Sequence, residues 1–184
     1  CREMVARGDL DTLSRERVFK ELEKALSAPH PSEFFAVLAS VNALAQMFQG
    51  VELTETKNLD GPATDTSPPS RFSQLVLENP DLDLQGLSKQ LAIPKHWLEL
   101  ASMTRTWAAA FCQVTTLSAD AILAVLERGD ARRKPERFAQ SVHISCQSLI
   151  IDSAEQTQIL GLWQRLVQET AKVSLPETAS GLSG

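Results

Sequence analysis

The chain has 184 residues and a mass of 20.2 kDa, which suits one globular domain or two small ones. Apolar residues make up 43% of it and charged residues 22%, a balance that excludes a wholly disordered chain and a collagen-like repeat. The formal net charge of −5 excludes a uniformly basic nucleic-acid-binding protein, although it is compatible with a local basic patch.

Cysteine usage and hydropathy point to a cytoplasmic protein. Cys1, Cys112 and Cys146 lack metal-ligand spacing, and we expect reduced thiols, two of which lie in apolar helical surroundings and behave as small apolar residues. No stretch approaches the run of about 18 apolar residues that spans a membrane, and no signal pattern precedes the first helix. The chain begins with Cys1 rather than Met, which we interpret as a fragment or a processed chain.

Helical periodicity predicts two helices before residue 48. Ser14 is a typical N-cap, with Leu13 and Val18 placed as a hydrophobic staple across the helix start. Two prolines, Pro29 and Pro31, end this helix, and Ser32 is predicted to cap the next one. The apolar face of the first helix comprises Val18, Leu22, Ala25 and Leu26.

The periodic pattern stops between residues 49 and 70. This segment has four acidic residues, one lysine, three prolines and two glycines, so it can bury little apolar surface. We predict a loop or mobile linker here. It separates an N-terminal helical part, residues 1–48, from a helical body, residues 71–175, and a disordered tail, residues 176–184.

Helical signals continue from residue 71 to the tail. Ser118 is a predicted N-cap, Gly129 a left-handed stop, Pro135 a first-turn residue, and Ser153 with Gln156 a capping box. Strand signals are nearly lacking. We therefore predict an all-α fold, an irregular bundle of about seven to nine helices.

The sequence has no nucleotide-binding glycine loop and no hydrolase motif. His30, His96 and His143 are isolated from one another, so a metal site built on them is not expected. Asp81 and Asp83 form a DxD pattern, which a helix start enriched in acidic residues explains better than a Mg²⁺ site does. We predict no catalytic residue and no metal ligand.

A basic cluster is the one charged feature above background. The window 127–137 has five cations and three carboxylates, a net charge of +2 on an acidic chain. Two interpretations stay open, namely a site that binds phosphate oxygens and a solvated turn with local ion pairs. The cations are Arg128, Arg132, Arg133, Lys134 and Arg137.

Residues 10–22, LDTLSRERVFKEL, resemble the neck-helix motif LSxERIxxEL of bacterial tRNA nucleotidyltransferases (CCA-adding enzymes) and their poly(A) polymerase relatives. The matching positions are Leu13, Ser14, Glu16, Arg17, Val18, Glu21 and Leu22. The similarity continues to residue 48 and resumes over residues 84–145. There, the sequence from Arg133 to Arg137 corresponds to an Arg-Lys-Pro-x-Arg element of the family.

The resemblance implies that nucleotide addition needs a second part of the protein besides the segment given by this chain. In the family, an N-terminal head with a Gly-Ser loop and a DxD pair binds Mg²⁺ and ATP or CTP. The chain lacks this head, and the DxD pattern at Asp81 and Asp83 follows the neck motif instead of preceding it, so we expect no cofactor in this chain and no catalysis without a head. The family's HD hydrolase region looks degenerate, because LVLENPDL and the segment Arg105 to Trp107 replace the expected His-Asp ligands.

The resemblance also implies which partners the neck and the body bind. The neck residues would support the nucleotide pocket of the head, or else they form only a charged helix face; they are Ser14, Glu16, Arg17 and Glu21. The basic cluster would contact tRNA or another structured RNA through backbone phosphates, with no membrane involved. A helical protein-interaction domain that lost RNA binding is the main alternative. A metal-dependent HD-type hydrolase is the third.

Overall fold

In the computed structural model, the described residues are 14–41, 43–48, 53, 56–61, 66–149 and 151–172, and helices without any strand make up their regular structure. The predicted all-α fold is therefore confirmed for this part of the chain. The helices occur in the order α2 (Arg15–Leu26), α3 (Pro31–Ser40), α4 (Ala43–Met47), the 3₁₀ helix η2 (Lys57–Asp60), α5 (Pro68–Glu78), α6 (Leu84–Leu91), α7 (Lys95–Cys112), α8 (Ala119–Arg128), α9 (Pro135–Ser148) and α10 (Ser153–Lys172).

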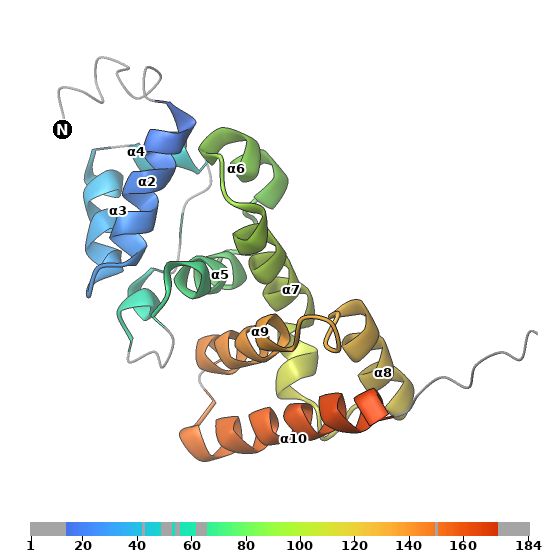
Figure 1. Ribbon diagram of the computed structural model, residues 1–184. Coiled ribbons are helices and arrows are strands. Elements are labelled where there is room, and N and C mark those ends of the chain that lie inside the picture. Colours follow the sequence, from blue (N-terminus) through green and yellow to red (C-terminus); the bar gives the residue numbers. More distant parts are fainter. Residues whose placement is uncertain are drawn as a thin grey trace, which may run out of the picture.

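The helices surround two hydrophobic cores, and the long helix α7 contributes to both (Figure 1). In the first core, α2 and α5 bury aromatic side chains against the N-terminal half of α7. The ring of Trp97 lies 5.1 Å from that of Phe19 and 5.7 Å from that of Phe72. The first pair is edge-to-face, the second is tilted, and such aromatic contacts stabilise a fold beyond the area they bury.

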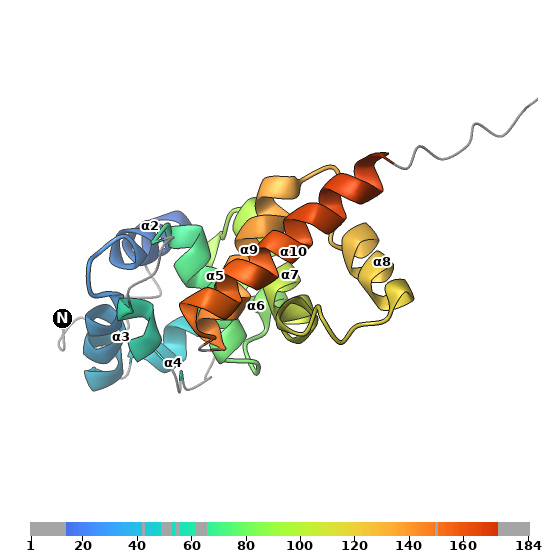
Figure 2. The ribbon, with the colours of Figure 1, turned by 90° about the horizontal axis from the view of Figure 1, so that it is seen from below.

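The second core joins the C-terminal half of α7 to α8, α9 and α10, with α10 packed on α9 (Figure 2). Phe111, Phe138 and Trp163 form a triangle of edge-to-face contacts with centroid distances of 5.2, 5.5 and 5.8 Å. The indole Nε1–H of Trp163 donates to the carbonyl oxygen of Phe111 at 2.9 Å. This hydrogen bond fixes α10 on α7 and satisfies the buried indole nitrogen.

Two predicted N-caps are confirmed. The hydroxyl of Ser14 accepts a hydrogen bond from the backbone N–H of Arg17, and that of Ser118 accepts one from Ala121. Leu13, the other half of the predicted staple, and the tail 176–184 lie outside the described residues.

The predicted cap at Ser32 is wrong, because the N-cap of α3 is His30, two residues earlier, and the helix begins at Pro31. The fixed φ of proline suits a first helical position. Ser32 instead donates its backbone N–H to Asp60 Oδ1 at 3.0 Å and its hydroxyl to Asp60 Oδ2. The start of α3 is thereby connected to η2.

The prediction at Gly129 is also wrong, because its φ is −75° whereas Asp130 has the left-handed φ of 55°. Glycine is still required at this position, since a Cβ there would lie 2.6 Å from the carbonyl oxygen of Val125. Asp130 tolerates the left-handed region better than most residues.

At the start of α10, the capping residue differs from the predicted one. Asp152, rather than Ser153, accepts hydrogen bonds from the backbone N–H groups of Ala154 and Glu155.

The segment predicted as a linker differs from expectation where it is described. Residues 57–60 form η2, and Leu59 is buried in the first core with 1% of its surface exposed. Helix α5 starts at Pro68, inside the predicted linker, and packs on both α2 and α7. The described N-terminal helices and the body therefore share one core.

Candidate nucleic-acid interface

The basic cluster lies in the sharp connection between α8 and α9, which we call the α8–α9 corner (residues 128–137). The backbone turns through the left-handed Asp130, and Ala131, which is fully buried, donates its N–H to the carbonyl oxygen of Leu126 at 3.0 Å. Pro135 then opens α9. Because the buried alanine anchors the turn, the longer basic side chains around it project to the surface.

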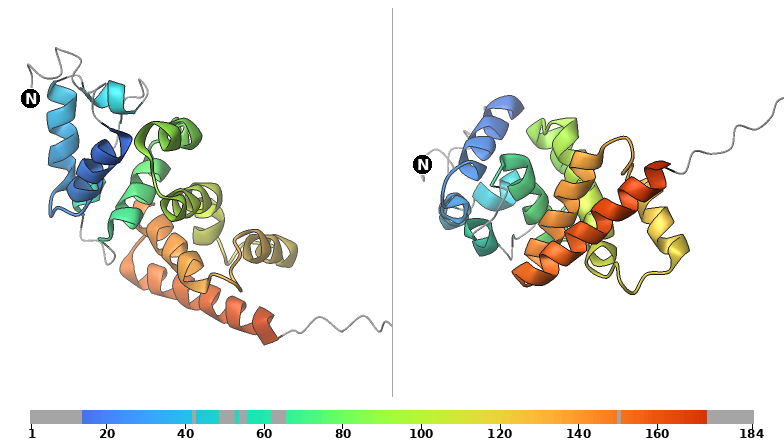
Figure 3. Two further views of the ribbon diagram at one scale, coloured as in Figure 1. Left: turned by 45° about the horizontal axis from the view of Figure 1, so that its top comes forward. Right: turned by 60° about the horizontal axis from the view of Figure 1, so that its bottom comes forward.

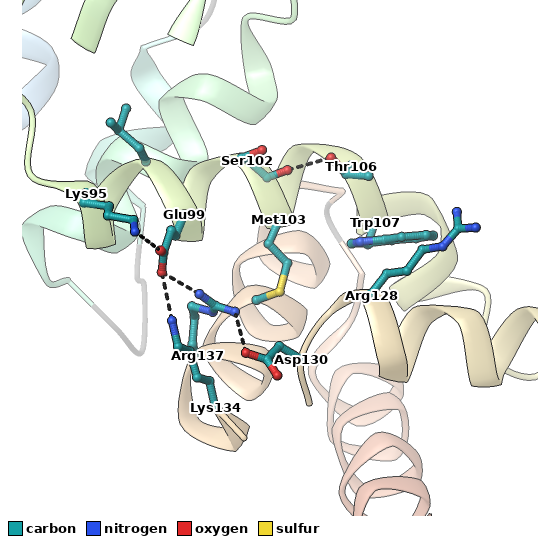
Figure 4. A pocket seen from close by; sticks show the side chains of 11 residues that line it. Lys95, Glu99, Ser102, Met103, Thr106, Trp107, Arg128, Asp130, Lys134 and Arg137 are labelled. Atoms are coloured by element: carbon teal, nitrogen blue, oxygen red, sulfur yellow. Dashed lines mark hydrogen bonds and ion pairs between the residues drawn. The ribbon is translucent and has the colours of Figure 1, made fainter. Parts of the chain in front are cut away.

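Part of this cluster is occupied by contacts to α7. The carboxylate of Glu99 accepts hydrogen bonds from Arg137 Nη1 at 2.6 Å and from Lys134 Nζ at 3.1 Å (Figure 4). Lys95 Nζ lies 3.7 Å from the other carboxylate oxygen. The hydrogen bond from Lys134 and the charges of Lys134, Arg137 and Lys95 hold the pKa of Glu99 below its usual value, against a smaller opposing effect of desolvation.

Asp130 extends the network along the corner. Its two carboxylate oxygens lie 3.8 Å from Arg137 Nη2 and 3.8 Å from Arg133 Nε, respectively. Arg137, with 21% of its side chain exposed, is therefore held between two carboxylates, whereas 82% of the Arg133 side chain is exposed. We assign Arg137 a structural role and regard Arg133 as available to a ligand.

Arg128 and Arg132 are exposed, and neither takes part in an ion pair within the described part of the chain. They face different sides of the corner. Arg128 lines a groove of about 620 Å³ against α7, while Arg132 and Arg133 line a second groove, of about 850 Å³, beside Thr170 of α10. Among the five predicted cations, Arg128 therefore lies in one groove, Arg132 and Arg133 lie in the other, and Lys134 and Arg137 are paired with Glu99 in a partly exposed network.

The neck residues are remote from this corner. Ser14 caps α2, and Glu16, Arg17 and Glu21 lie exposed on that helix. Helix α2 and helix α8 are at opposite ends of the molecule in both Figure 1 and the left view of Figure 3. The neck and the corner are thus separate surfaces rather than one site.

Two residues of α7 beside the corner were not among the predicted site residues. Trp107 is half-buried against the second core and also lines the groove beside Arg128. Glu99 comes from a different helix than the basic cluster, and no spacing in the sequence relates the two. The sequence signal that could have indicated this groove is Trp107 itself, a large aromatic residue in an apolar pattern on α7.

Other candidate chemistries find little support in the described residues. No group of three or more His, Cys, Asp or Glu side chains there could hold a metal ion. Asp83 of the DxD pattern caps α6 by accepting the backbone N–H of Gln85 at 3.0 Å, as the helix-start interpretation predicts. No helix in the same residues is both long and apolar enough to cross a membrane.

The sequence is similar to an RNA-binding family model and to CCA-adding enzymes. Residues 1–54 match a family model described as the probable RNA and SrmB-binding site of polymerase A. The chain is 30% identical over 145 residues to the CCA-adding enzyme of Coxiella burnetii, an alignment that covers 77% of this chain. It is 31% identical over 186 aligned positions to the multifunctional CCA protein of Neisseria meningitidis, covering 78% of this chain.

The chain belongs to the CCA-adding enzyme and poly(A) polymerase family, and it matches the C-terminal region. A third relative, the CCA-adding enzyme of Bordetella pertussis, is 33% identical over 141 residues. The chain spans only 38% of the Coxiella enzyme and 43% of the Neisseria protein. No solved structure matches it. The family predicted from the neck motif is confirmed.

Proposed function

We propose that this chain is the RNA-binding part of a tRNA nucleotidyltransferase-like protein and that the α8–α9 corner contacts backbone phosphates of tRNA or another structured RNA. The observation that carries the proposal is the exposed set Arg128, Arg132 and Arg133 on a chain of this family. Arginine guanidinium groups bind phosphate oxygens without reading bases. A local basic corner can do so on a protein whose net charge is −5.

The test is the affinity of the chain for a tRNA transcript, measured by filter binding at several salt concentrations. Arg132→Ala should weaken binding and reduce the slope of log affinity against log salt by about 0.7 to 0.9, and Arg132→Ala/Arg133→Ala by about twice that. The matched control is Arg165→Ala, an exposed arginine on α10 outside the corner. An unchanged slope in the double variant would exclude the corner as the RNA contact.

Catalysis forms the second step of the proposal. Nucleotide addition at RNA 3′ ends would require an N-terminal head that supplies Mg²⁺ and ATP or CTP sites, with the exposed neck residues Glu16 and Arg17 facing that head. Supplied with tRNA, ATP, CTP and Mg²⁺, the present chain should extend no RNA end. Extension by the chain alone would contradict this step while leaving RNA binding untouched.

A protein partner is the second candidate function. The matching family description names SrmB together with RNA, and Val37 on α3, within the matched residues, is 55% exposed. A helical interaction surface at this end is compatible with RNA binding at the corner. A pull-down with SrmB tests this candidate by comparing the wild type with Val37→Glu. If SrmB retains the wild type and the variant equally, α3 is excluded as the interaction surface.

A further inference from the structure

We propose that the groove between α7 and the α8–α9 corner receives one unpaired nucleobase of the bound RNA, stacked on the indole of Trp107 beside the guanidinium of Arg128. This inference rests on the proposed function, because it names the part of the RNA that the corner holds. It adds a base contact to a surface that was predicted to bind phosphates only.

The groove has the size and charge for such a ligand. Its volume of about 620 Å³ lies within the range of sites that hold small organic ligands. Four cationic side chains and two carboxylates line it, which leaves a net charge of +2 beside an apolar wall containing Leu98 and Met103. A nucleotide combines a flat apolar face with an anionic phosphate, and this lining complements both.

Trp107 differs from the other tryptophans of the chain. Trp97 and Trp163 are each 2% exposed and make ring contacts with phenylalanines. Trp107 is half-buried against the second core, and in the described residues it makes no ring contact with an aromatic side chain. A rigid indole with a surface open to a groove is the kind of platform on which nucleobases stack.

Figure 4 shows how the groove is divided between its two ends. Trp107 and Arg128 lie beside each other at one end, and the network of Glu99, Lys134 and Arg137 occupies the other. The network fixes the corner on α7, so the groove that Trp107 and Arg128 line is held in place before any ligand arrives. A base stacked on Trp107 would leave its phosphate near Arg128, where a guanidinium can bind it.

Base-paired RNA does not fit this arrangement, because its bases are stacked on one another and their faces are inaccessible. An acidic peptide could pair with the cations but has no planar group for the indole. The occupant that uses both features is a loop, bulge or end of a structured RNA. The proposal therefore predicts a difference between tRNA and a blunt RNA duplex that phosphate binding alone does not.

The experiment titrates the chain with a tRNA transcript and, separately, with a blunt RNA duplex of similar length, while tryptophan emission and affinity are both recorded. A base stacked on an indole quenches its emission, and the buried Trp97 and Trp163 supply a constant background. Trp107→Phe keeps an aromatic ring but removes the reporter. Trp107→Leu keeps an apolar side chain without a ring, and circular dichroism checks that both variants fold.

We expect tRNA, and not the duplex, to quench the wild type, and we expect Trp107→Phe to lose this quenching. Trp107→Leu should bind tRNA about 5- to 100-fold more weakly than the wild type, with unchanged duplex affinity. Binding of tRNA without quenching, equal quenching by both RNAs, or unchanged tRNA affinity of Trp107→Leu would each overturn the base site alone. Polyglutamate is titrated in the same way, and quenching equal to that by tRNA would assign the groove to an acidic peptide instead. If the chain does not bind tRNA, the proposed function is overturned together with the base site.

Discussion

The guanidinium of Arg137 lies 2.6 Å from the carboxylate of Glu99, and this contact joins α9 to α7 across the edge of the corner groove. The same guanidinium lies 3.8 Å from Asp130. One arginine of the basic cluster is therefore committed to holding the corner in place. The exposed arginines that we propose for RNA binding depend on it for their position.

The first prediction separates this structural arginine from its exposed neighbour. Arg137→Met should lower the free energy of unfolding by about 1 to 2 kcal/mol, because a charged hydrogen bond is lost and Glu99 keeps weaker partners. Arg132→Met should change it by less than about 0.5 kcal/mol. Urea denaturation measures both values. Equal effects of the two substitutions would mean that the contact between α7 and α9 is irrelevant to stability.

The second prediction concerns a carboxylate that offsets part of the positive charge of the groove. In Glu99→Gln, Lys134 loses its ionic partner and Arg137 keeps only Asp130, so the local positive charge increases by one. Affinity for the tRNA transcript should rise by up to about fivefold at low salt, an effect of roughly 1 kcal/mol, and salt should weaken the gain. Glu155→Gln, an exposed site on α10, is the control. Weaker tRNA binding by Glu99→Gln would show that the network matters more for positioning than for charge.

The third prediction concerns a buried cation in the first core. Arg71 is 5% exposed, and its Nη1 donates to the carbonyl oxygens of Leu26 at 2.7 Å and Ala28 at 2.6 Å. The carbonyl of Leu26 is one of those left unpaired at the end of α2, and that of Ala28 lies just beyond the helix. Arg71→Met should destabilise the fold by about 2 to 4 kcal/mol, since it leaves buried acceptors without donors.

Thermal and urea unfolding measure this effect. Arg105→Met provides a matched control, because Arg105 is only half-buried and donates to one carbonyl oxygen, that of Leu82. It should cost about 1 kcal/mol. A loss of stability no larger for Arg71→Met than for Arg105→Met would contradict the role assigned to Arg71.

The fourth prediction concerns two thiols that face each other between α7 and α9. The Sγ atoms of Cys112 and Cys146 lie 3.7 Å apart. The Cys146 thiol stabilises a thiolate on Cys112 and lowers the pKa of Cys112, whereas the same contact, with burial, raises the pKa of Cys146. Because a lowered pKa yields thiolate at lower pH, alkylation of Cys112 should reach half its maximal rate below about pH 8.5, the value for an unperturbed thiol.

Iodoacetamide labelling followed by peptide mass spectrometry gives the rate at each cysteine. Cys112 should react before Cys146 at every pH. Removing the donor in Cys146→Ala should move the Cys112 profile toward higher pH. The same profile in the wild type and Cys146→Ala would exclude the thiol contact as its cause.

Comparison of particular elements shows what could be predicted from sequence. The helix starts at Ser14 and Ser118 follow from a local rule, because a side chain caps a backbone N–H only two or three residues away. At Gly129 the local rule correctly placed the helix stop but not the left-handed residue. Glycine is needed there because of Phe138 and Val125, a requirement of packing rather than of backbone conformation.

The site was less predictable because its contacts join distant parts of the chain. The composition of residues 127–137 indicated the basic corner, but Glu99, from another helix, decides which cations are occupied. The burial of Arg71 does not follow from any local pattern, because its acceptors lie 43 and 45 positions away. Trp107 fits an apolar stripe equally well whether its outer surface faces a helix or a groove.

The central claim is that RNA contacts the α8–α9 corner, and photo-crosslinking tests it most directly. A tRNA transcript containing 4-thiouridine is bound to the chain, irradiated and digested, and the linked peptides are identified by mass spectrometry. The account predicts crosslinks concentrated in peptides that contain Trp107 or residues 128–137. Crosslinks confined to α2 and α3, with the corner peptides unmodified, would contradict it.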